Sequence, residues 1–476
     1  MPKTKRTKIV ATLGPATSDR VTLKEMILAG VDVFRINFSH ADYDDVKERV
    51  KMIRELGDEL QTAVAILGDL QGPKLRVGVM KEEVIVQPGD TISFCTGEEF
   101  EGTASRVYMN YDNFPKDVKP GERILLDDGK LMFEVLKTNK KDTVETKVIQ
   151  GGPLRSRKGV NLPNTNISLP ALTMKDKQDA VFAIEQQVDW IALSFVRHAE
   201  DLKELQSLIE AHSEYKIPII AKIEKPEAVK NIDKIVAYCD GLMVARGDLG
   251  VEVPAEEVPL IQKELVLTAK RSRIPVIIAT QMMETMISSL TPTRAEVNDV
   301  ANSVMDGADA VMLSGETSVG KYPVEVIRTM ANICKRVENS NLINVPHEPP
   351  HIRTNRYITK SVCYHAAQMA NEISAKAICT LTNSGYTAFQ ISAWRPDAHI
   401  LVYTSNRRIL SRLNLLWGVS SFYYDKFVST DETVDDVNRI AHERGFVEKG
   451  DYLINLAAMP IADKGMVNTL RVSHIK

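Results

Sequence analysis

Two carboxylates and an amine stand close together in this sequence and have the chemistry to act on a phosphate. Lys222 lies two residues before Glu224, so on an extended strand both side chains point to the same face. Asp248 follows the next apolar run along the chain. Two carboxylates without His or Cys are hard oxygen ligands that suit Mg²⁺ or Mn²⁺. An ammonium beside such an ion could stabilise the charge that spreads over the oxygens of a transferring phosphoryl group.

Each of these residues also has a purely structural interpretation. Glu224 and Asp248 could be surface acids where loops begin, and Lys222 could form a salt bridge inside the fold. The run 247–250 looks like a turn into a short helix, whose free N–H groups could hold a carboxylate. A plain loop would fit the same run.

Short apolar runs precede these residues and must position them. Runs rich in Val, Ile, Ala and Leu occupy 8–12, 31–37, 63–69, 190–195, 217–223, 241–245, 275–279 and 310–313. Continuous apolar runs of this length are typical of strands buried on both faces of a parallel sheet. Helical spacing follows at 202–211, 227–237, 259–272 and 293–305, which indicates βα units. Eight such units predict an α/β fold, the TIM (β/α)8 barrel.

Functional residues of such a barrel lie where strands end and loops begin. Any one residue at these positions could be a structural cap or an ion pair, but together they place cations, carboxylates and hydroxyls around one mouth. They are Arg35, Asn37, Ser39, Asp69, Lys222, Glu224, Arg246, Gly247, Asp248, Thr280, Gln281, Ser314 and Glu316.

Two segments do not fit the barrel repeat. About 120 residues separate the third and fourth runs, which is too long for a loop, and they contain β-like runs with an Asp-Gly hairpin signal at 128–129. Pro and Gly at both junctions favour a hinged lid. After a Pro-rich segment at 346–350, a helix is expected at 358–373 and strands at 377–382, 399–404 and 452–456. We therefore expect a barrel at 1–71 and 169–345, an inserted β-rich lid at 72–168, and a C-terminal α/β domain at 346–476.

Composition narrows the class of protein. The chain has 476 residues, 44% of them hydrophobic, and a net charge of −3, which is typical of a globular protein without the basic field of a nucleic-acid binder. Its five cysteines form no CxxC pair, which argues against disulfides or a thiolate zinc site and suits a reducing compartment. No apolar run reaches the ~18 residues of a membrane span. We expect a cytoplasmic protein that binds neither nucleic acid nor membrane.

The strings at the strand ends are more specific than their spacing, and they resemble those of pyruvate kinase. They are FRINFSH at 34–40, GD at 68–69, KGVNLP at 158–163, AKIE at 221–224, MVARGDLG at 243–250, ATQM at 279–282 and MLSGET at 312–317. The resemblance implies a glycolytic phosphotransferase that moves the phosphoryl group of phosphoenolpyruvate to ADP, giving pyruvate and ATP, with Mg²⁺ or Mn²⁺ as cofactor. It also implies a lid after the third strand, a regulatory C-terminal domain and a homotetramer.

The resemblance assigns roles to barrel residues. Arg35 would contact the phosphoryl group, and Lys222 would stabilise the transition state. Glu224 and Asp248 would bind the metal. The substrate would be held after the sixth and seventh strands by Ala245, Arg246, Gly247, Asp248 and Thr280.

The resemblance also covers the nucleotide and the final proton transfer. Arg76 and Lys158 would bind the nucleotide phosphates from the lid side, with His40 on the barrel side. Thr280 and Ser314 are candidates for the relay that protonates the enolate.

The run after the third strand departs from the members that require K⁺. Asn37, Ser39, Asp69 and Leu70 would form the oxygen cage of the monovalent-cation site. Many members have Thr where Leu70 stands and Glu where Lys74 stands, and this sequence resembles the K⁺-independent branch. The Lys74 ammonium could occupy the cage in place of K⁺, so we expect no K⁺ requirement. The alternative is that Lys74 faces solvent.

A loop in the C-terminal domain resembles the one that binds a sugar-phosphate effector in many relatives. It consists of Thr382, Asn383, Ser384, Gly385 and Thr387, whose hydroxyl and N–H groups at a helix start suit a phosphate. The run 463–469 differs from the Gly-rich run of fructose-1,6-bisphosphate-activated members. We expect a phosphorylated allosteric effector whose identity the sequence leaves open, with a vestigial cap motif as the alternative.

Two other functions were weighed. A Mg²⁺-enolate aldolase, or another barrel enzyme acting on phosphoenolpyruvate or pyruvate, would share the carboxylate site but need no nucleotide, and the lid with Arg76 and Lys158 argues against it. A non-catalytic binding protein on an enzyme scaffold is disfavoured because Lys222, Glu224 and Asp248 are all present.

Overall fold

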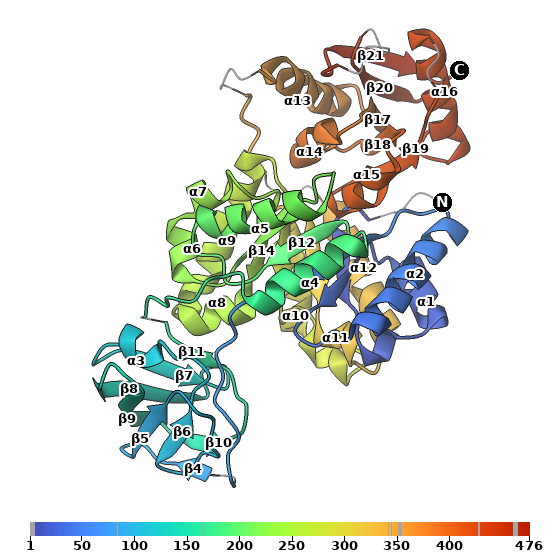
Figure 1. Cartoon of the computed structure of the whole chain (residues 1–476). Coiled ribbons are helices and arrows are strands. Elements are labelled where there is room, and N and C mark those ends of the chain that lie inside the picture. Colours follow the sequence, from blue (N-terminus) through green and yellow to red (C-terminus); the bar gives the residue numbers. More distant parts are fainter. Residues whose placement is uncertain are drawn as a thin grey trace.

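Eight parallel strands close into a barrel at the centre of the molecule (Figure 1). The computed structural model describes residues 5–82, 84–163, 165–340, 342–343, 345–350, 355–426, 429–459 and 465–476. The barrel strands are β1 (Lys8–Thr12), β2 (Val33–Asn37), β3 (Ala65–Asp69), β12 (Trp190–Leu193), β13 (Ile219–Ile223), β14 (Gly241–Ala245), β15 (Val276–Ala279) and β16 (Ala310–Leu313). Their order is β1-β16-β15-β14-β13-β12-β3-β2, closed between β2 and β1. The predicted barrel and its eight strands are confirmed.

Alternation along each strand decides which side chains reach the barrel axis. Val33, Leu67 and Ile220 belong to one cluster inside the barrel, whereas Phe34, Ile66 and Ala221 pack in a second cluster outside it. Side chains two residues apart on a strand point the same way. The residues two positions after the inner ones are Arg35, Asp69 and Lys222, so the strands themselves direct these three toward one mouth.

Helices cover the outside of the barrel. They are α1 (Arg20–Ala29), α2 (Tyr43–Glu59), α4 (Met174–Glu185), α5 (Ala199–His212), α6 (Pro226–Lys230), α7 (Ile232–Ile235), α9 (Val258–Ser272), α10 (Arg294–Met305) and α12 (Pro323–Glu338). The predicted continuous helix at 227–237 was wrong, because Asn231 leaves helical geometry between α6 and α7. The Asn231 side chain instead donates to the Arg197 carbonyl oxygen at 3.1 Å.

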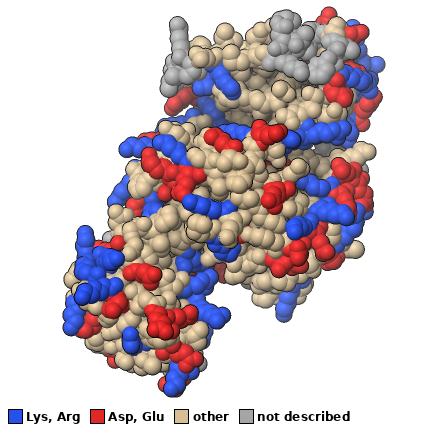
Figure 2. All heavy atoms as spheres, in the orientation of Figure 1, with Lys and Arg blue, Asp and Glu red and all other residues tan. Residues whose placement is uncertain are grey.

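The lid is a separate β lobe between β3 and α4 (Figures 1 and 2). Its larger sheet has the order β11-β7-β8-β9-β5-β6, formed by β5 (Thr91–Cys95), β6 (Arg106–Tyr108), β7 (Arg123–Leu126), β8 (Leu131–Thr138), β9 (Thr143–Gln150) and β11 (Val160–Asn161). A second pair joins β4 (Val84–Val86) to β10 (Gly152–Leu154), and α3 (Phe114–Asp117) lies beside the sheet. The hairpin predicted at the Asp-Gly signal is confirmed, because Leu126 pairs with Leu131 across that turn.

The C-terminal α/β domain lies on the side of the barrel away from the lid (Figure 1). Its sheet has the order β19-β18-β17-β20-β21, with β17 (Ala377–Leu381), β18 (His399–Thr404), β19 (Val419–Tyr423), β20 (Tyr452–Ala457) and β21 (Thr469–His474). Its helices are α13 (Tyr357–Glu372), α14 (Tyr386–Ala393), α15 (Arg407–Arg412) and α16 (Thr430–Glu443). The expected helix and three strands are confirmed, while β19, β21 and α16 had not been predicted. The residue boundaries of the three domains stay a prediction.

Charges of both signs alternate over the face seen in Figure 2, which agrees with the near-neutral composition. Among the described helices, none is long and apolar enough to cross a membrane.

Candidate active site

Lys222 is the centre of a buried hydrogen-bonded cluster at the barrel mouth. Its Nζ lies 3.2 Å from Asp69 Oδ1 and 3.0 Å from Glu224 Oε1, and it donates to Ser194 Oγ at 2.7 Å. Lys222 is only 8% exposed. Burial would lower the pKa of this amine, but the charges of Asp69 and Glu224 outweigh burial and raise the pKa above its ordinary value. The ammonium is therefore held as a fixed cation away from bulk water.

Arg35 and Asp69 form the second half of this cluster. Arg35 Nε donates to Asp69 Oδ2 at 2.6 Å, and the guanidinium also reaches Thr12 Oγ1 at 3.0 Å. Burial would raise the pKa of Asp69, but Lys222 and Arg35 lower it overall. The mouth thus holds two cations and an ionised carboxylate in contact.

Glu224 and Asp248 have the donor chemistry for a divalent cation. Glu224 Oε2 accepts from the Phe195 N–H at 2.8 Å, which fixes the carboxylate. Burial raises the pKa of Glu224, Lys222 opposes this, and the charge of the half-buried Asp248 raises it further. The two carboxylates are therefore close enough to repel each other, and a bound cation would relieve that repulsion.

A short helix begins directly after β14, and the backbone N–H groups of its first turn have no partner within the helix. This helix, α8 (Arg246–Glu252), confirms that the run 247–250 is helical rather than a plain loop. The Gly247 N–H donates to Thr280 Oγ1 at 2.7 Å. Thr280 and Gln281 have φ values of 69° and 54°, a left-handed conformation that is unusual for a β-branched residue such as Thr280. The strained turn brings the Thr280 hydroxyl over the start of α8.

Two predicted residues near this turn have structural partners of their own. Arg246 donates to both Asp299 oxygens at 2.6 and 2.7 Å and to the Thr280 carbonyl at 2.8 Å. Its side chain is therefore held by the barrel. The half-buried Ser314 donates its backbone N–H to Glu316 Oε2 at 2.7 Å.

The predicted nucleotide residues lie on both sides of the junction between lid and barrel. Lys158 Nζ lies 2.9 Å from Asp127 Oδ1, and this hydrogen bond lowers the pKa of Asp127. Arg76 pairs with Gly159 in a β-bridge and donates to the Arg157 carbonyl at 3.0 Å. His40 lines a cavity of about 380 Å³ on the barrel, together with Pro15, Asp45, Arg49 and Ser318 among others. Among the described residues, no hydrogen bond or ion pair joins His40 to Arg76 or Lys158.

The residues of the predicted monovalent-cation cage cluster beside Asp69, but Lys74 does not join them. Asn37 Oδ1 accepts from the Ser39 N–H at 3.1 Å, and the Leu70 carbonyl accepts from Ser194 Oγ at 2.7 Å. Lys74 is exposed and lines a small cavity of about 60 Å³ between lid and barrel, which Asp248 also lines.

Four residues in or near the site had not been predicted. Ser194 directly follows the fourth barrel strand, so the rule applied to the other strand ends would have found it. Asp127 follows the lid strand β7, whereas Asp299 on α10 and Glu252 on α8 have no sequence signal that connects them to the site.

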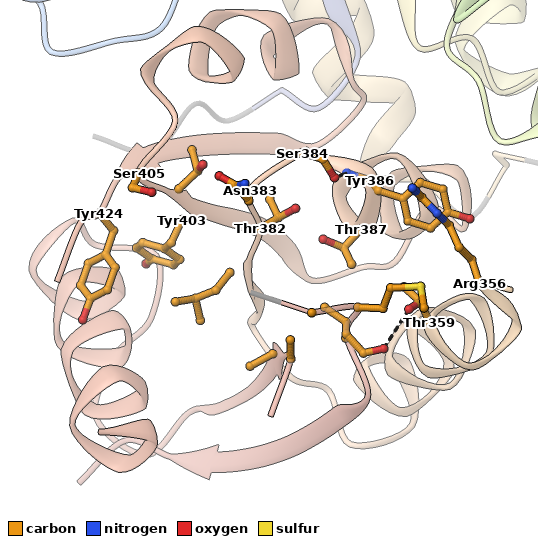
Figure 3. Close-up of a pocket in the computed structure, with 17 residues that line it drawn as sticks. Arg356, Thr359, Thr382, Asn383, Ser384, Tyr386, Thr387, Tyr403, Ser405 and Tyr424 are labelled. Carbon is orange, nitrogen blue, oxygen red and sulfur yellow. Dashed lines mark hydrogen bonds between the residues drawn. The ribbon is translucent and has the colours of Figure 1, made fainter. Parts of the chain in front are cut away.

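The predicted effector loop lines a cavity of about 360 Å³ in the C-terminal domain (Figure 3). Thr382, Asn383, Ser384 and Thr387 line one end, with Gly385 N–H donating to Thr382 Oγ1 at 3.0 Å. Tyr403, Tyr424 and Arg356 are among the other residues that line it, and the Arg356 guanidinium lies 4.3 Å from the centre of the Tyr386 ring. Of the run 463–469 considered above, residues 463 and 464 lie outside the described residues.

The chain is similar, over nearly its whole length, to family models, to curated relatives and to a solved structure. Residues 4–327 match the model "Pyruvate kinase, barrel domain" and residues 360–473 match "Pyruvate kinase, alpha/beta domain". "Pyruvate kinase 2" of Synechocystis sp. is 43% identical over 480 residues, covering 100% of this chain and 80% of the relative. The pyruvate kinase of Corynebacterium glutamicum is 43% identical over 470 residues, covering 98% of this chain and 97% of the relative. A crystal structure of a pyruvate kinase from Cryptosporidium parvum superposes with a TM-score of 0.92 at 32% identity, covering 99% of this chain and 97% of that one.

Proposed function

This chain belongs to the pyruvate kinase family, and from that premise we propose that its barrel mouth transfers the phosphoryl group of phosphoenolpyruvate to ADP, giving pyruvate and ATP. The observation that carries the proposal is the buried cluster in which Lys222 touches both Asp69 and Glu224. A fixed cation beside oxygen donors is what a developing phosphoryl charge requires. Family membership speaks against the aldolase and the non-catalytic protein.

Mg²⁺ (or Mn²⁺) is proposed as the cofactor, bound by Glu224 and Asp248. The described residues contain no group of three or more His, Cys, Asp or Glu able to hold a metal. Two carboxylates fit Mg²⁺ nevertheless, because this ion usually keeps waters and substrate phosphates as its remaining ligands. When bound, the ion neutralises phosphate charge and fixes the position of the phosphoryl group.

The residues of the chain supply the remaining electrostatics and positioning. Arg35 and Lys222 would face the phosphoryl group from the barrel interior and stabilise charge on its oxygens. The substrate carboxylate would lie against the N–H groups of Gly247 and Asp248 and the Thr280 hydroxyl, with Ala245 and Arg246 shaping the turn. The enolate would be protonated through Thr280 and Ser314.

We propose that Arg76 and Lys158 bind the nucleotide phosphates, because two cationic side chains suit the negative charge of ADP. The cavity at His40 is large enough for part of a nucleoside and lies on the barrel side. Lid closure would then exclude water that could hydrolyse the phosphoryl group.

K⁺ is proposed to be dispensable. The support is that Asp69, the acid of the cage, already has two cationic partners in Arg35 and Lys222. The exposed position of Lys74 means that its entry into the cage would accompany movement of the lid junction.

Regulation and assembly are also proposed from family membership. A phosphorylated effector would bind the loop Thr382–Thr387, because hydroxyls and N–H groups at the start of α14 suit a phosphate. We propose a cytoplasmic homotetramer, for which the edge strand β21 offers unpaired backbone groups.

A coupled assay tests the proposed function. The purified chain is mixed with phosphoenolpyruvate, ADP and Mg²⁺, and pyruvate is followed with lactate dehydrogenase and NADH while ATP is followed with luciferase. We expect equal amounts of both products and no turnover when Mg²⁺ is chelated. Pyruvate formed without ADP would mean that water takes the phosphoryl group, which would contradict the proposed transfer.

A further inference from the structure

The buried carboxylate of Glu252 lies where the lid returns to the barrel. Glu252 is the last residue of α8 and is 5% exposed. Its Oε1 accepts from Lys225 Nζ at 2.6 Å and from Asn161 Nδ2 at 2.9 Å. Lys225 belongs to the barrel and Asn161 to lid strand β11, so one oxygen connects the two domains.

Each arm of this contact leads to a residue of the proposed site. Lys225 follows Glu224 directly, at the end of the strand that also carries Lys222. Asn161 lies three residues after Lys158, and β11 pairs with β7, which ends next to Asp127, the partner of Lys158. Holding Asn161 therefore holds the lid strand from which Lys158 reaches out.

The second oxygen of the Glu252 carboxylate does not take part in this contact. Glu252 Oε2 is buried and has no hydrogen-bond partner among the described residues. An unsatisfied buried carboxylate oxygen costs stability, and an apolar side chain would avoid that cost. The arrangement therefore serves something other than folding.

A second contact attaches the segment that leads from the lid back to the barrel, and it involves only the backbone of that segment. Arg197 of the barrel donates to the carbonyl oxygens of Ile167 and Leu169 at 2.5 and 2.6 Å. These backbone bonds attach the segment whatever its side chains are. The hydrogen bond from Asn161 to Glu252 differs, because it depends on the lid side chain.

We propose that Asn161, Glu252 and Lys225 form a hinge latch that orients the lid over the barrel, which makes Asn161 and Glu252 positioning residues for the use of ADP. The inference rests on the proposed function, in which Lys158 and Arg76 bind the nucleotide. Without the latch the lid samples more orientations, so Lys158 and Arg76 face the nucleotide site in a smaller fraction of the molecules. Binding of phosphoenolpyruvate, which uses barrel residues alone, is unaffected.

The variant Asn161→Leu tests the latch with little change in volume. A hydrogen bond to a charged group is worth on the order of a tenfold change in binding, so we expect the KM for ADP to rise about tenfold. The KM for phosphoenolpyruvate and kcat at saturating ADP should stay within about twofold of wild type. Equal KM values for ADP in variant and wild type would overturn the proposal.

The conservative variant Glu252→Gln keeps a side-chain oxygen that accepts from Asn161 Nδ2 and Lys225 Nζ, so both hydrogen bonds of the latch remain. It should keep most of the wild-type KM for ADP, whereas Glu252→Leu, which removes the acceptor, should raise the KM for ADP as Asn161→Leu does. Lys137→Met is the matched control, because it removes a contact of Glu145 inside the lid, 3.0 Å in length, and should leave the KM unchanged.

Hydrogen exchange of the free enzyme separates failure of the latch from failure of the proposed function. Asn161→Leu should exchange faster than wild type at 158–163 and 71–77, with the barrel and lid cores unchanged. Faster exchange in a chain that makes no ATP would keep the latch and reject the function. Unchanged exchange would reject the latch whatever the chain catalyses.

Discussion

At the residue scale, the proposed chemistry depends most on the position of a single amine. Lys222 contacts Asp69, Glu224 and Ser194, which come from three different strand ends. Three acceptors leave the ammonium little freedom, so it is placed before substrate arrives. Preorganised charge of this kind needs no rearrangement during the reaction.

Replacing Lys222 with Met keeps the length of the side chain and removes its charge. We expect kcat to fall by about 10³-fold or more, as for the loss of a main charge-stabilising group, while phosphoenolpyruvate still binds. Steady-state kinetics and direct titration with phosphoenolpyruvate measure the two quantities. Turnover near the wild-type value would show that Lys222 is not the stabilising cation.

The residue at position 74 should decide the response to K⁺. In buffer with tetramethylammonium as the monovalent cation, the wild-type chain should be fully active, and KCl should add less than about twofold. Lys74→Glu restores the acid of the K⁺-dependent members and should make activity depend on added K⁺. The proposal is wrong if KCl strongly activates the wild type.

At the scale of single elements, the backbone of a strand or of a helix start decides where functional groups point. In β13 the alternation of inner Ile220 and outer Ala221 directs Lys222 inward, so a one-residue slip of the strand would remove the amine from the site. In the C-terminal domain, α14 starts at Gly385, whose φ of 81° lets the loop turn back onto the helix. Each element fixes functional groups through backbone geometry rather than through their own contacts.

The start of α14 is where an effector phosphate should bind. The probes are a panel of sugar monophosphates and fructose 1,6-bisphosphate, measured as activation at low phosphoenolpyruvate. Ser384→Asp places a negative charge in the loop and should abolish activation without changing basal activity. Ser207→Asp, an equally exposed change on α5, should respond as wild type does. Activation that survives Ser384→Asp would place the effector elsewhere.

His399 at the start of β18 should make the C-terminal domain sensitive to acid. Burial lowers the pKa of His399 to about 4, with Arg6 and Lys376 adding to the effect. The unfolded chain takes up this proton near pH 6.5 and the folded chain only near pH 4, so stability falls as pH drops through that window. The loss is at most about 3 kcal/mol.

Denaturant unfolding at several pH values between 7.5 and 4 measures this effect. His399→Gln should lose less stability than wild type over the window, and the two curves should run parallel above pH 7. Equal losses in both proteins would contradict the assignment.

The contact between the barrel and the C-terminal domain dominates at the scale of the whole molecule. All three tryptophans of the chain lie there: Trp190 donates to the Arg412 carbonyl at 3.1 Å, Arg273 stacks on Trp394, and Arg395 stacks on Trp417. Arg395 also reaches Asp309, the residue before β16, at 3.0 Å. The barrel and the C-terminal domain are thus joined through buried side chains.

Asp309 should be a main source of this joint's stability. It contacts both Lys270 and Arg395, and all three are almost fully buried. Burial and the charge of Arg395 lower the pKa of Lys270 to about 7, so without Asp309 this amine loses its proton. Asp309→Asn therefore leaves the buried Arg395 cation without a counter-charge, which should cost about 3–5 kcal/mol. Glu55→Gln, which breaks an exposed pair with Arg20, should cost at most about 1 kcal/mol. Calorimetric unfolding of both variants checks the contrast, and similar midpoints would contradict it.

The sequence alone determined the features that local patterns encode. The eight barrel strands, the inserted lid and the strand-end residues from Arg35 to Ser314 followed from runs and strings a few residues long. The loop 382–387 was singled out only by its resemblance to an effector loop of relatives. Lys222 and Glu224 could be paired because their spacing of two has a fixed meaning on a strand.

Only the tertiary structure decided which distant side chains meet. Four of the contacts described above join residues that lie between 28 and 91 positions apart in the sequence. They are Lys222 with Ser194, Arg246 with Asp299, Asn161 with Glu252, and Arg395 with Asp309. The break at Asn231 was likewise beyond the sequence, and the choice between a caged and a solvent-exposed Lys74 had been left open. Such contacts depend on how helices and domains pack, and packing is set by the sum of many weak interactions over the whole chain rather than by any short string.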